Sequence, residues 1–555
     1  MTDDVITTHQ AGTADEAASE RTGARRFVVG LCWLAIVVGV IARFAPRSDL
    51  WLDEALSVNI SKLPLGDIGE ALRHDGHPPL YYYLLHSWMQ IGGESDWWVR
   101  ALSGLFGVAS IPLGYLAGAR ISRRSGDDPG RTQLAALLTA AMVAVIPYGV
   151  RYGSETRMYS LLITLVLAGY LLIDDLFRNR RSGRAEWLTA VGAALVTAVL
   201  LWTQYWSMWL LATVGLIALW RLWRPPPTGR RGVWFAVGSL VAGGILFLPW
   251  VPALLYQSAH TGTPWGDVIR PTTVLLVTII EFAGRPVAEP QLLSYVLVTM
   301  VVLGVFGVVV NRRRGDGSAA EAVQIAPGTT PRIRYELTVV VGTLAVGSVA
   351  SVATSATYQS RYASVVFPLF CLCVAAGLSV LRGVRTLAAV LVVVLVGSFV
   401  TIGMEVTSDR TQAGVVADQI VADAGDDPAD AVVITCPDQL SPATDRALHE
   451  RTGHDWEVIP FPTGGTPERV DWVDYEQRNE AATDESFIAE QAERITPDTT
   501  VYLVFTPGYN TFGSKCEGLD AALSETHVRD PAVQAEPDGD TYFENMGLWV
   551  YRPRT

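Results

Sequence analysis

The chain has 555 residues, of which 50% are hydrophobic and 17% charged, and its mean hydropathy is +0.28. Soluble proteins carry about a quarter charged residues, whereas this chain repeats apolar runs near the ~20 residues that cross a bilayer. The net charge of −13 is uneven, because residues 405–555 hold about 30 acidic and 10 basic side chains. These values exclude a soluble globular protein, and the acidic tail excludes a nucleic-acid binder, which needs a basic face.

The N-terminal residues 1–26 precede the first apolar run. They are polar and rich in Thr, Ala, Asp and Glu, so we expect a disordered cytoplasmic segment. Arg21, Arg25 and Arg26 come directly before the apolar run, and no small-residue cleavage site follows it. This pattern indicates an uncleaved first membrane helix rather than a signal peptide.

Arginine clusters orient the apolar runs, because cytoplasmic loops retain positive charge. The clusters fall on one side of the membrane if the chain crosses it about eleven times, with the N-terminus cytoplasmic and the tail extracytoplasmic. The predicted spans are 27–44, 97–119, 132–149, 157–177, 187–203, 206–223, 232–250, 292–310, 335–354, 362–381 and 386–404. We therefore expect residues 27–404 to form an α-helical, multi-pass domain in the cytoplasmic (plasma) membrane.

Two apolar stretches, 79–92 and 271–284, are too short to cross and lie between extracytoplasmic loops. We interpret both as interfacial helices. The segment 45–96 then becomes a long outer loop, and long loops in compact folds tend to carry function.

The tail, residues 405–555, changes character. Strand-like runs at 431–435, 458–461, 500–505 and 547–551 alternate with helix-like stretches near 411–424, 442–452, 484–495 and 517–525. This alternation predicts a small extracytoplasmic α/β domain. Cys436 and Cys516 are the two cysteines of the tail, and they form either a disulfide or two separate thiols.

An acidic pair, Asp53-Glu54, follows the first predicted span among Leu50, Trp51 and Leu52. Carboxylates near membrane depth cost desolvation energy, so they indicate a function or a partner. A partly desolvated carboxylate is suited to act as a general base. The alternative is structural, with Asp53 capping a short helix and Glu54 in its first turn.

A second outer motif is Arg73-His74-Asp75-Gly76-His77-Pro78-Pro79. The two prolines fix an extended entry to the next helix and would hold His77 rigidly. The alternatives are an ordinary loop histidine, or a divalent cation held by His74, Asp75 and His77. Two histidines and one carboxylate are a weak metal signal, so no metal site is predicted.

Two further outer segments carry arginine against the orientation bias. One is Arg151-Tyr152-Gly153-Ser154-Glu155-Thr156-Arg157-Met158-Tyr159, and the other is Tyr358-Gln359-Ser360-Arg361-Tyr362. A guanidinium binds phosphate well, although a bilayer headgroup or Glu155 would also satisfy these arginines. Acid–base residues beside a phosphate site suggest group transfer from a phosphorylated lipid.

These motifs, together with Val99-Arg100-Ala101-Leu102-Ser103-Gly104-Leu105-Phe106-Gly107, resemble the GT-C glycosyltransferases. The likeness covers roughly residues 27–404 and is strongest to the branch with protein O-mannosyltransferases and lipid A aminoarabinose transferases. The resemblance implies a polyprenyl-phosphate sugar donor and an acceptor hydroxyl outside the cytoplasmic membrane. The acceptor could be a lipid, a glycan or a protein.

The resemblance also implies residue roles. Asp53 would be the general base, with Glu54 positioning the acceptor or the base. Residues expected to bind the donor or its phosphate are His77, Arg157, Tyr159, Arg361 and Tyr362. Direct attack would invert the sugar configuration. This branch does not obligatorily use a metal, so no cofactor is firmly predicted, although a divalent cation stays open.

The leading donor sugar is mannose, followed by a pentose such as arabinose. The main alternative function is a secondary transporter or a lipid-carrier flippase, in which ionisable residues lie near the bilayer midplane. The polar motifs of this chain instead fall at the outer ends of the predicted spans. A non-catalytic scaffold displaying its tail is a second alternative, and it leaves the acidic pair without a purpose.

Overall fold

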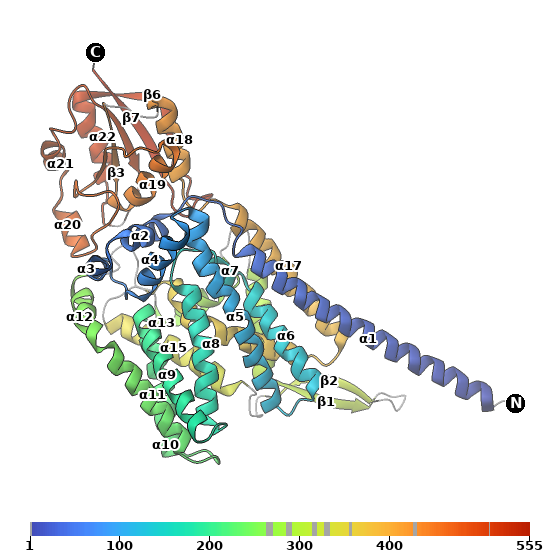
Figure 1. Ribbon diagram of the computed structural model, residues 1–555. Coiled ribbons are helices and arrows are strands. Elements are labelled where there is room, and N and C mark those ends of the chain that lie inside the picture. The colour runs from blue at the N-terminus through green and yellow to red at the C-terminus, as the bar shows by residue number, and fades with distance from the viewer. Residues whose placement is uncertain are drawn as a thin grey trace.

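The computed structural model describes residues 3–261, 270–284, 291–313, 319–326, 333–353, 358–425, 430–509 and 511–554. A bundle of long helices carries a smaller α/β domain on one of its ends (Figure 1). This arrangement confirms the prediction of an α-helical polytopic fold followed by a C-terminal α/β domain.

Each of the eleven predicted spans coincides with a helix of the bundle. These helices are α1 (Asp3–Ala42), α5 (Asp96–Arg124), α6 (Pro129–Val145), α8 (Tyr159–Phe177), α9 (Arg184–Thr203), α10 (Ser207–Trp223), α11 (Arg231–Phe247), α14 (Gln291–Phe306), α15 (Arg334–Ala353), α16 (Phe367–Val380) and α17 (Val384–Thr407). Within the described ranges, six helical segments are long and apolar enough to cross a membrane. The chain is therefore a multi-pass membrane protein, while the number of crossings and the orientation stay predictions.

Helix α1 begins at Asp3, inside the segment that we expected to be disordered. The backbone continues as helix without a break from Asp3 into the apolar run Thr22–Ala42. Adding turns to a helix that is already nucleated costs little, and the alanines and glutamates of this segment favour the helical state.

The predicted span 292–310 ends early. Helix α14 stops at Phe306, and an antiparallel hairpin of β1 (Gly307–Arg313) and β2 (Ala319–Ile325) follows at the end of the bundle opposite the C-terminal domain (Figure 1). The run Val308–Val310 looked like the end of a membrane helix, but β-branched residues also favour strands.

Buried ion pairs hold the same end of the bundle together. Arg124 on α5 lies 2.7 Å from Glu336 on α15 and 3.3 Å from Asp174 on α8. Arg120 lies 2.9 Å from Asp175, the neighbour of Asp174. Arginines that predicted the cytoplasmic side of the membrane therefore also join three helices.

Short helices connect the bundle to the C-terminal domain. The first connection contains α2 (Leu52–Lys62), α3 (Leu65–Asp75) and α4 (Leu80–Gly92), which lie between the two parts in Figure 1. The predicted interfacial stretches correspond to α4 and α13 (Pro271–Phe282). The remaining short elements are α7 (Pro147–Arg151), η1 (Leu248–Trp250), α12 (Val251–His260) and η2 (Ser360–Val365).

The C-terminal domain contains a mixed five-stranded sheet of order β4-β3-β5-β7-β6. Strand β3 (Ala431–Cys436) is parallel to β4 (Val458–Pro460) and β5 (Thr500–Phe505), and β7 (Gly547–Pro553) is antiparallel to β5 and to β6 (His527–Ala535). Its helices and short turn are α18 (Ala413–Ala424), η3 (Asp438–Leu440), α19 (Ser441–Thr452), α20 (Tyr475–Ala481), α21 (Asp484–Glu490) and α22 (Lys515–Thr526). The sequence predicted β3, β4, β5 and β7 but not β6 or α20.

Two features tie this domain together and to the bundle. A disulfide joins Cys436 at the end of β3 to Cys516 on α22, 80 positions later. Leu56 of α2 packs into the core of the C-terminal domain, with Phe461 and Tyr475. The domain therefore rests directly on the helix that carries the acidic pair.

Candidate active site

A cavity of about 570 Å³ lies between the helical bundle and the C-terminal domain. Its lining from the bundle includes Asp53, His77, Arg157, Trp206, Arg361 and Tyr362. The C-terminal domain supplies Gln439, Trp472, Tyr509 and the segment Phe543–Asn545. The four sequence motifs singled out above therefore converge on one chamber, which the tail covers.

Asp53 lies in the first turn of α2, and its side chain is 13% exposed. Its Oδ2 atom lies 2.5 Å from Nη1 of Arg361 and 3.8 Å from Nη2 of Arg157. Trp51, not Asp53, is the N-cap residue of α2, and its own side chain makes no capping hydrogen bond. The carboxylate of Asp53 is thus directed to two arginines in the cavity rather than to the helix terminus.

Glu54 occupies a different environment from its neighbour. Its buried carboxylate accepts hydrogen bonds from Arg100 at 2.8 and 2.6 Å and from the Thr156 backbone N–H at 2.8 Å. Burial raises the pKa of Glu54, but the pairing with Arg100 and Arg410 outweighs it and holds the pKa below its usual range. Glu54 does not line the cavity. Of the two roles expected from the sequence, contact with the acceptor does not match this position, and positioning of the base Asp53 stays a prediction.

His77 links Asp75 to Arg157. Its Nδ1 lies 2.8 Å from Oδ2 of Asp75, and its Nε2 lies 2.9 Å from Nη2 of Arg157. A guanidinium has only donors, so Nε2 accepts and Nδ1–H donates to Asp75. Burial raises the pKa of Asp75, but His77 and Arg157 bring it below its ordinary value. The chain Asp75–His77–Arg157 therefore fixes both the tautomer of the ring and the direction of the guanidinium.

Arg157 is 2% exposed and is held on several sides. Its Nη1 donates to Oγ of Ser57 at 3.1 Å and to the backbone oxygen of Asp53 at 3.3 Å. Within the described part of the chain its Nε has no hydrogen-bond partner. A buried guanidinium with an unused donor, next to a cavity, is suited to bind an anion.

The two predicted tyrosines fall in different places. Tyr362 lines the cavity and stacks on Trp206, with ring centroids 5.8 Å apart and an angle of 23° between the rings. Tyr159 does not line the cavity; it is fully buried against Tyr152, with ring centroids 4.8 Å apart. Tyr362 and Trp206 form an apolar wall of the kind that sugar rings pack against. Tyr159 instead packs against Tyr152 within its own segment, 151–159.

The motif 99–107 on α5 supports the site. Arg100 holds Glu54, and Oγ of Ser103 donates to the backbone oxygen of Arg157 at 3.0 Å. Gly107 lies against the buried Arg43, where an added Cβ would come within 2.7 Å of its Nε atom. The arginine, serine and glycine of this motif therefore contact three neighbouring segments, those of Glu54, Arg157 and Arg43.

Sequence reasoning missed Glu544 of the C-terminal domain. Its Oε1 accepts the backbone N–H of Leu52 at 3.1 Å, while its buried Oε2 has no partner among the described residues. Burial, with the nearby charges of Asp53 and Glu54, raises the pKa of this carboxyl to about 8. Besides Asp53 and Asp75, the cavity thus contains a third carboxyl, with a raised pKa, that no local sequence pattern marked.

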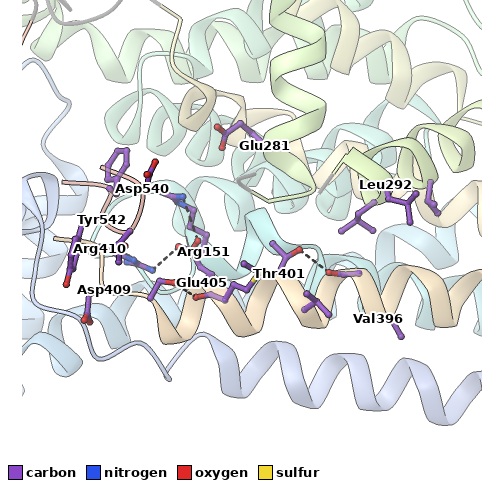
Figure 2. A pocket seen from close by; sticks show the side chains of 18 of the residues that line it. Arg151, Glu281, Leu292, Val396, Thr401, Glu405, Asp409, Arg410, Asp540 and Tyr542 are labelled. Carbon is purple, nitrogen blue, oxygen red and sulfur yellow. Dashed lines mark hydrogen bonds and ion pairs between the residues drawn. The ribbon is translucent and has the colours of Figure 1, made fainter. Parts of the chain in front are cut away.

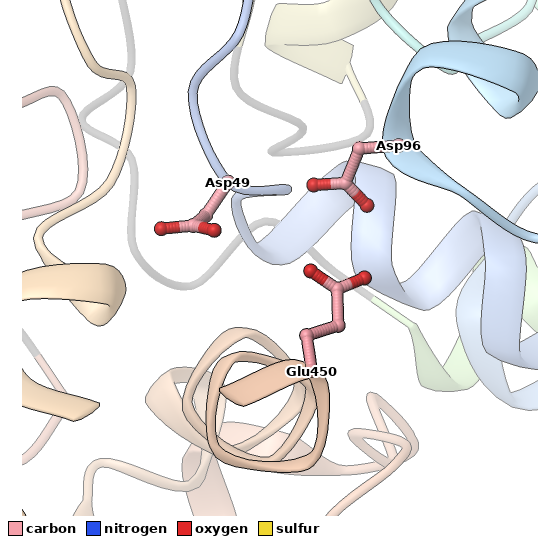
Figure 3. Close-up of side chains that lie close together, drawn as sticks. All are labelled: Asp49, Asp96 and Glu450. Atoms are coloured by element: carbon pink, nitrogen blue, oxygen red, sulfur yellow. The ribbon is translucent and has the colours of Figure 1, made fainter. Parts of the chain in front are cut away.

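The residues expected for a divalent cation do not assemble around one point. Both ring nitrogens of His77 are engaged, and Nδ1 of His74 lies 2.9 Å from Asp471 of the C-terminal domain. A separate group of carboxylates, Asp49, Asp96 and Glu450, comes together between the two parts of the molecule (Figure 3). Arg446 lies 2.7 Å from both Asp96 and Glu450, and Arg451 lies 3.3 Å from Asp49. We interpret these carboxylates as an arginine-bridged contact between the domains.

No protein-family model matches the chain, and a search of curated proteins finds no match. Among solved structures, ArnT from Cupriavidus metallidurans in the apo state superposes with a TM-score of 0.55 and 13% identity over 95% of this chain and 98% of that one. The chain has the GT-C fold. ArnT bound to undecaprenyl phosphate gives a TM-score of 0.54 and 12% identity over 94% and 97% of the two chains.

A third GT-C structure is more distant. The archaeal oligosaccharyltransferase AglB from Archaeoglobus fulgidus, in complex with an inhibitory peptide and a dolichol-phosphate, gives a TM-score of 0.43 and 12% identity over 96% of this chain and 74% of that one. The prediction of a GT-C fold is confirmed by the comparison with ArnT, which extends through the C-terminal domain. The mannosyltransferase branch stays a prediction.

Proposed function

We propose that this protein is an inverting glycosyltransferase that moves a sugar from a polyprenyl-phosphate donor to an acceptor hydroxyl on the outer face of the cytoplasmic membrane. The observation that carries this proposal is the placement of Asp53 beside Arg361 and Arg157 in one partly closed cavity. A base and two phosphate ligands in one chamber are what sugar transfer from a lipid phosphate requires. The undecaprenyl phosphate bound to ArnT supports a polyprenyl carrier.

In the proposed reaction, the acceptor oxygen attacks the anomeric carbon of the donor sugar. The carbon–oxygen bond to phosphate breaks, and polyprenyl phosphate leaves with the bonding electrons. Asp53 takes the proton of the acceptor hydroxyl, a step that general bases typically accelerate 10²- to 10⁴-fold. Arg361 and Arg157 stabilise the negative charge that develops on the leaving phosphate.

The ion pair between Asp53 and Arg361 represents the resting state. A donor phosphate that binds Arg361 competes with Asp53 for the same guanidinium. Binding of the donor would therefore release the carboxylate of Asp53 toward the acceptor. Asp53 would then act as a base only when the donor is bound, and this dependence would prevent unproductive proton transfer in its absence.

The other cavity residues have supporting roles in this proposal. His77 positions Arg157, and Tyr362 with Trp206 packs against the donor sugar. Glu544 lies beside Asp53, because its Oε1 accepts the backbone N–H of the adjacent Leu52, and it helps to hold the segment that carries the base. Mannose is our first choice of donor sugar and a pentose such as arabinose our second.

The test is transfer of radiolabelled sugar from polyprenyl-phosphate donors in host membranes by the purified full-length protein. We expect Asp53→Asn to bind donor but to transfer at least 100-fold more slowly than the wild type. Asp67→Asn, an exposed carboxylate of the same connecting segment, is the matched control and should transfer normally. Equal transfer by Asp53→Asn and wild type would remove Asp53 from the chemistry, and absence of donor binding by the wild type would overturn the proposal.

A further inference from the structure

A second and larger cavity, of about 1100 Å³, opens beside the catalytic chamber. One end is apolar and is formed by α14 and α17, with Leu292 and Val396 on its walls (Figure 2). The other end is polar and includes Arg151, Glu405 and Arg410, together with the segment 539–543 of the C-terminal domain. We call this cavity the α14–α17 groove. The apolar end and the polar end of this groove match the apolar chain and the polar headgroup of a membrane lipid.

The length of the groove suits a lipid chain. Along α17 its lining ahead of Glu405 runs from Val392 to Met404, which is about 18 Å at the ~1.5 Å rise of an α-helix. One leaflet of a bilayer core is about 15 Å thick, half of ~30 Å. The apolar part of the groove can therefore hold an acyl or prenyl chain while its polar end reaches the headgroup level.

The charges at the polar end do not favour a phosphate. Arg151 and Arg410 each pair with Glu405, at 3.8 and 3.7 Å, and Arg410 also pairs with Glu54 at 3.6 Å. Glu281 and Asp540 add further negative charge. The carboxylates at this end outnumber the two arginines, so the charge of a lipid phosphate would be repelled.

Hydrogen-bonding capacity remains at the same end. Arg410 is 5% exposed, and its buried Nε has no partner within the described ranges; the same holds for Nε of Arg151. Each is a donor that a hydroxyl oxygen can satisfy without bringing charge. An uncharged, hydroxylated headgroup is not repelled by the carboxylates, and its oxygens accept hydrogen bonds from these donors.

Phe543 connects the groove to the catalytic chamber, because it lines both. Its ring lies 4.7 Å from that of Trp51 on the chamber side and 5.6 Å from the guanidinium of Arg151 on the groove side. A headgroup at the polar end of the groove is therefore one side chain away from the cavity of Asp53.

We infer that the α14–α17 groove binds the acceptor, and that the acceptor is an uncharged glycolipid whose headgroup hydroxyl enters the catalytic chamber past Phe543. This inference rests on the proposed transferase function and selects a lipid among the acceptors left open by the sequence. The two lipid substrates are separated by charge. The anionic donor goes to Arg361 and Arg157, and the neutral acceptor goes to the groove.

The test is lipid retention by the full-length protein in mixed micelles, measured by native mass spectrometry. The probes are a monoglucosyl diacylglycerol, phosphatidylglycerol as its anionic counterpart, and undecaprenyl phosphate for the donor site. Val396→Trp fills the groove, and Val241→Trp is the matched control on the lipid-facing side of α11, since the two valines are 56% and 57% exposed. Asp540→Lys reverses a charge at the polar end, and because Asp540 is exposed we expect this variant to fold normally.

We expect the wild type to retain the glucolipid at least tenfold better than phosphatidylglycerol. Val396→Trp should lose about tenfold of this retention while Val241→Trp keeps it, and Asp540→Lys should shift the preference toward phosphatidylglycerol. Unchanged glucolipid retention in Val396→Trp, or better retention of phosphatidylglycerol by the wild type, would overturn the inference. If the wild type does not retain undecaprenyl phosphate, the transferase proposal itself fails.

Discussion

Nη1 of Arg361 lies 2.5 Å from Oδ2 of Asp53, although 308 positions separate the two residues in the chain. Arg361 is the second residue of η2, which precedes α16, and Asp53 lies in the first turn of α2. The hydroxyl of Tyr148 shares its one proton between the backbone oxygens of Ser360 and Arg361, at 3.0 and 3.1 Å, and so holds the arginine segment in place. The proposed base and the proposed phosphate ligand are therefore preassembled.

Replacement of Arg361 should weaken the donor site. We expect Arg361→Gln to bind undecaprenyl phosphate 10- to 100-fold more weakly, since a hydrogen bond to a charged group contributes about 1.5–3 kcal/mol. Equilibrium binding of the labelled lipid by the purified protein measures this. Arg47→Gln, an exposed arginine of the same connecting segment as Asp53, is the control. Wild-type affinity in Arg361→Gln would remove this residue from the phosphate site.

His77 should act through Arg157 and not as a proton carrier. His77→Ala leaves Nη2 of Arg157 and the carboxylate of Asp75 without this shared partner, so we expect kcat to fall about tenfold with little change in KM. His77→Asn, which can still accept from Arg157, should recover part of the rate. His74→Ala, whose ring contacts Asp471 instead, serves as the control. A kcat of His77→Ala equal to that of the wild type would show that Arg157 needs no such support.

Glu544 should make stability depend on pH. Burial raises its pKa in the folded protein to about 8, well above the ordinary value of a glutamate carboxyl. Because the folded state holds this proton more tightly than the unfolded state does, the protonated carboxyl stabilises the fold at low pH. This contribution to the free energy of unfolding is lost progressively as pH rises from about 4.5 through 8. We expect Glu544→Gln to lose less stability than the wild type between pH 5 and pH 9. Thermal unfolding at several pH values tests this, and parallel curves for the two proteins would contradict it.

Glu54 should be required for folding rather than for the chemical step. It forms a buried, bidentate pair with Arg100, and loss of one partner of such a pair typically costs about 3–5 kcal/mol. We expect Glu54→Gln to unfold at lower temperature, and the fraction that remains folded to keep most of its transfer rate. Normal stability combined with lost transfer would return Glu54 to the chemistry that the sequence suggested.

The helices of the bundle could be predicted because hydropathy and arginine placement are local properties of the chain. The β1–β2 hairpin could not, since the valines at 308–310 satisfy both a membrane helix and a strand. Strand β6 was missed because Arg529, Asp530 and Pro531 interrupt its apolar pattern, while its pairing with β7 is set by the rest of the sheet.

The site was predictable only in part. Asp53, His77, Arg157, Arg361 and Tyr362 share a chamber because each ends or begins an element at the same end of the bundle. Neighbours in sequence were harder to separate: a helix turns about 100° per residue, so Asp53 and Glu54 point in different directions. Glu544 follows Asp53 by almost 500 positions, and no spacing rule joins residues that only the docked tail brings together.

The covering of the catalytic chamber by the C-terminal domain has a consequence for the fate of the donor. A membrane domain without this cover would still hold Asp53, Arg157 and Arg361, but its chamber would be open to water. Water would then compete with the acceptor for the activated sugar, and the lipid would be cleaved without making a product. In the proposed reaction, residues such as Trp472, Tyr509 and Phe543 would therefore favour transfer over hydrolysis by keeping water out, without touching the reacting atoms.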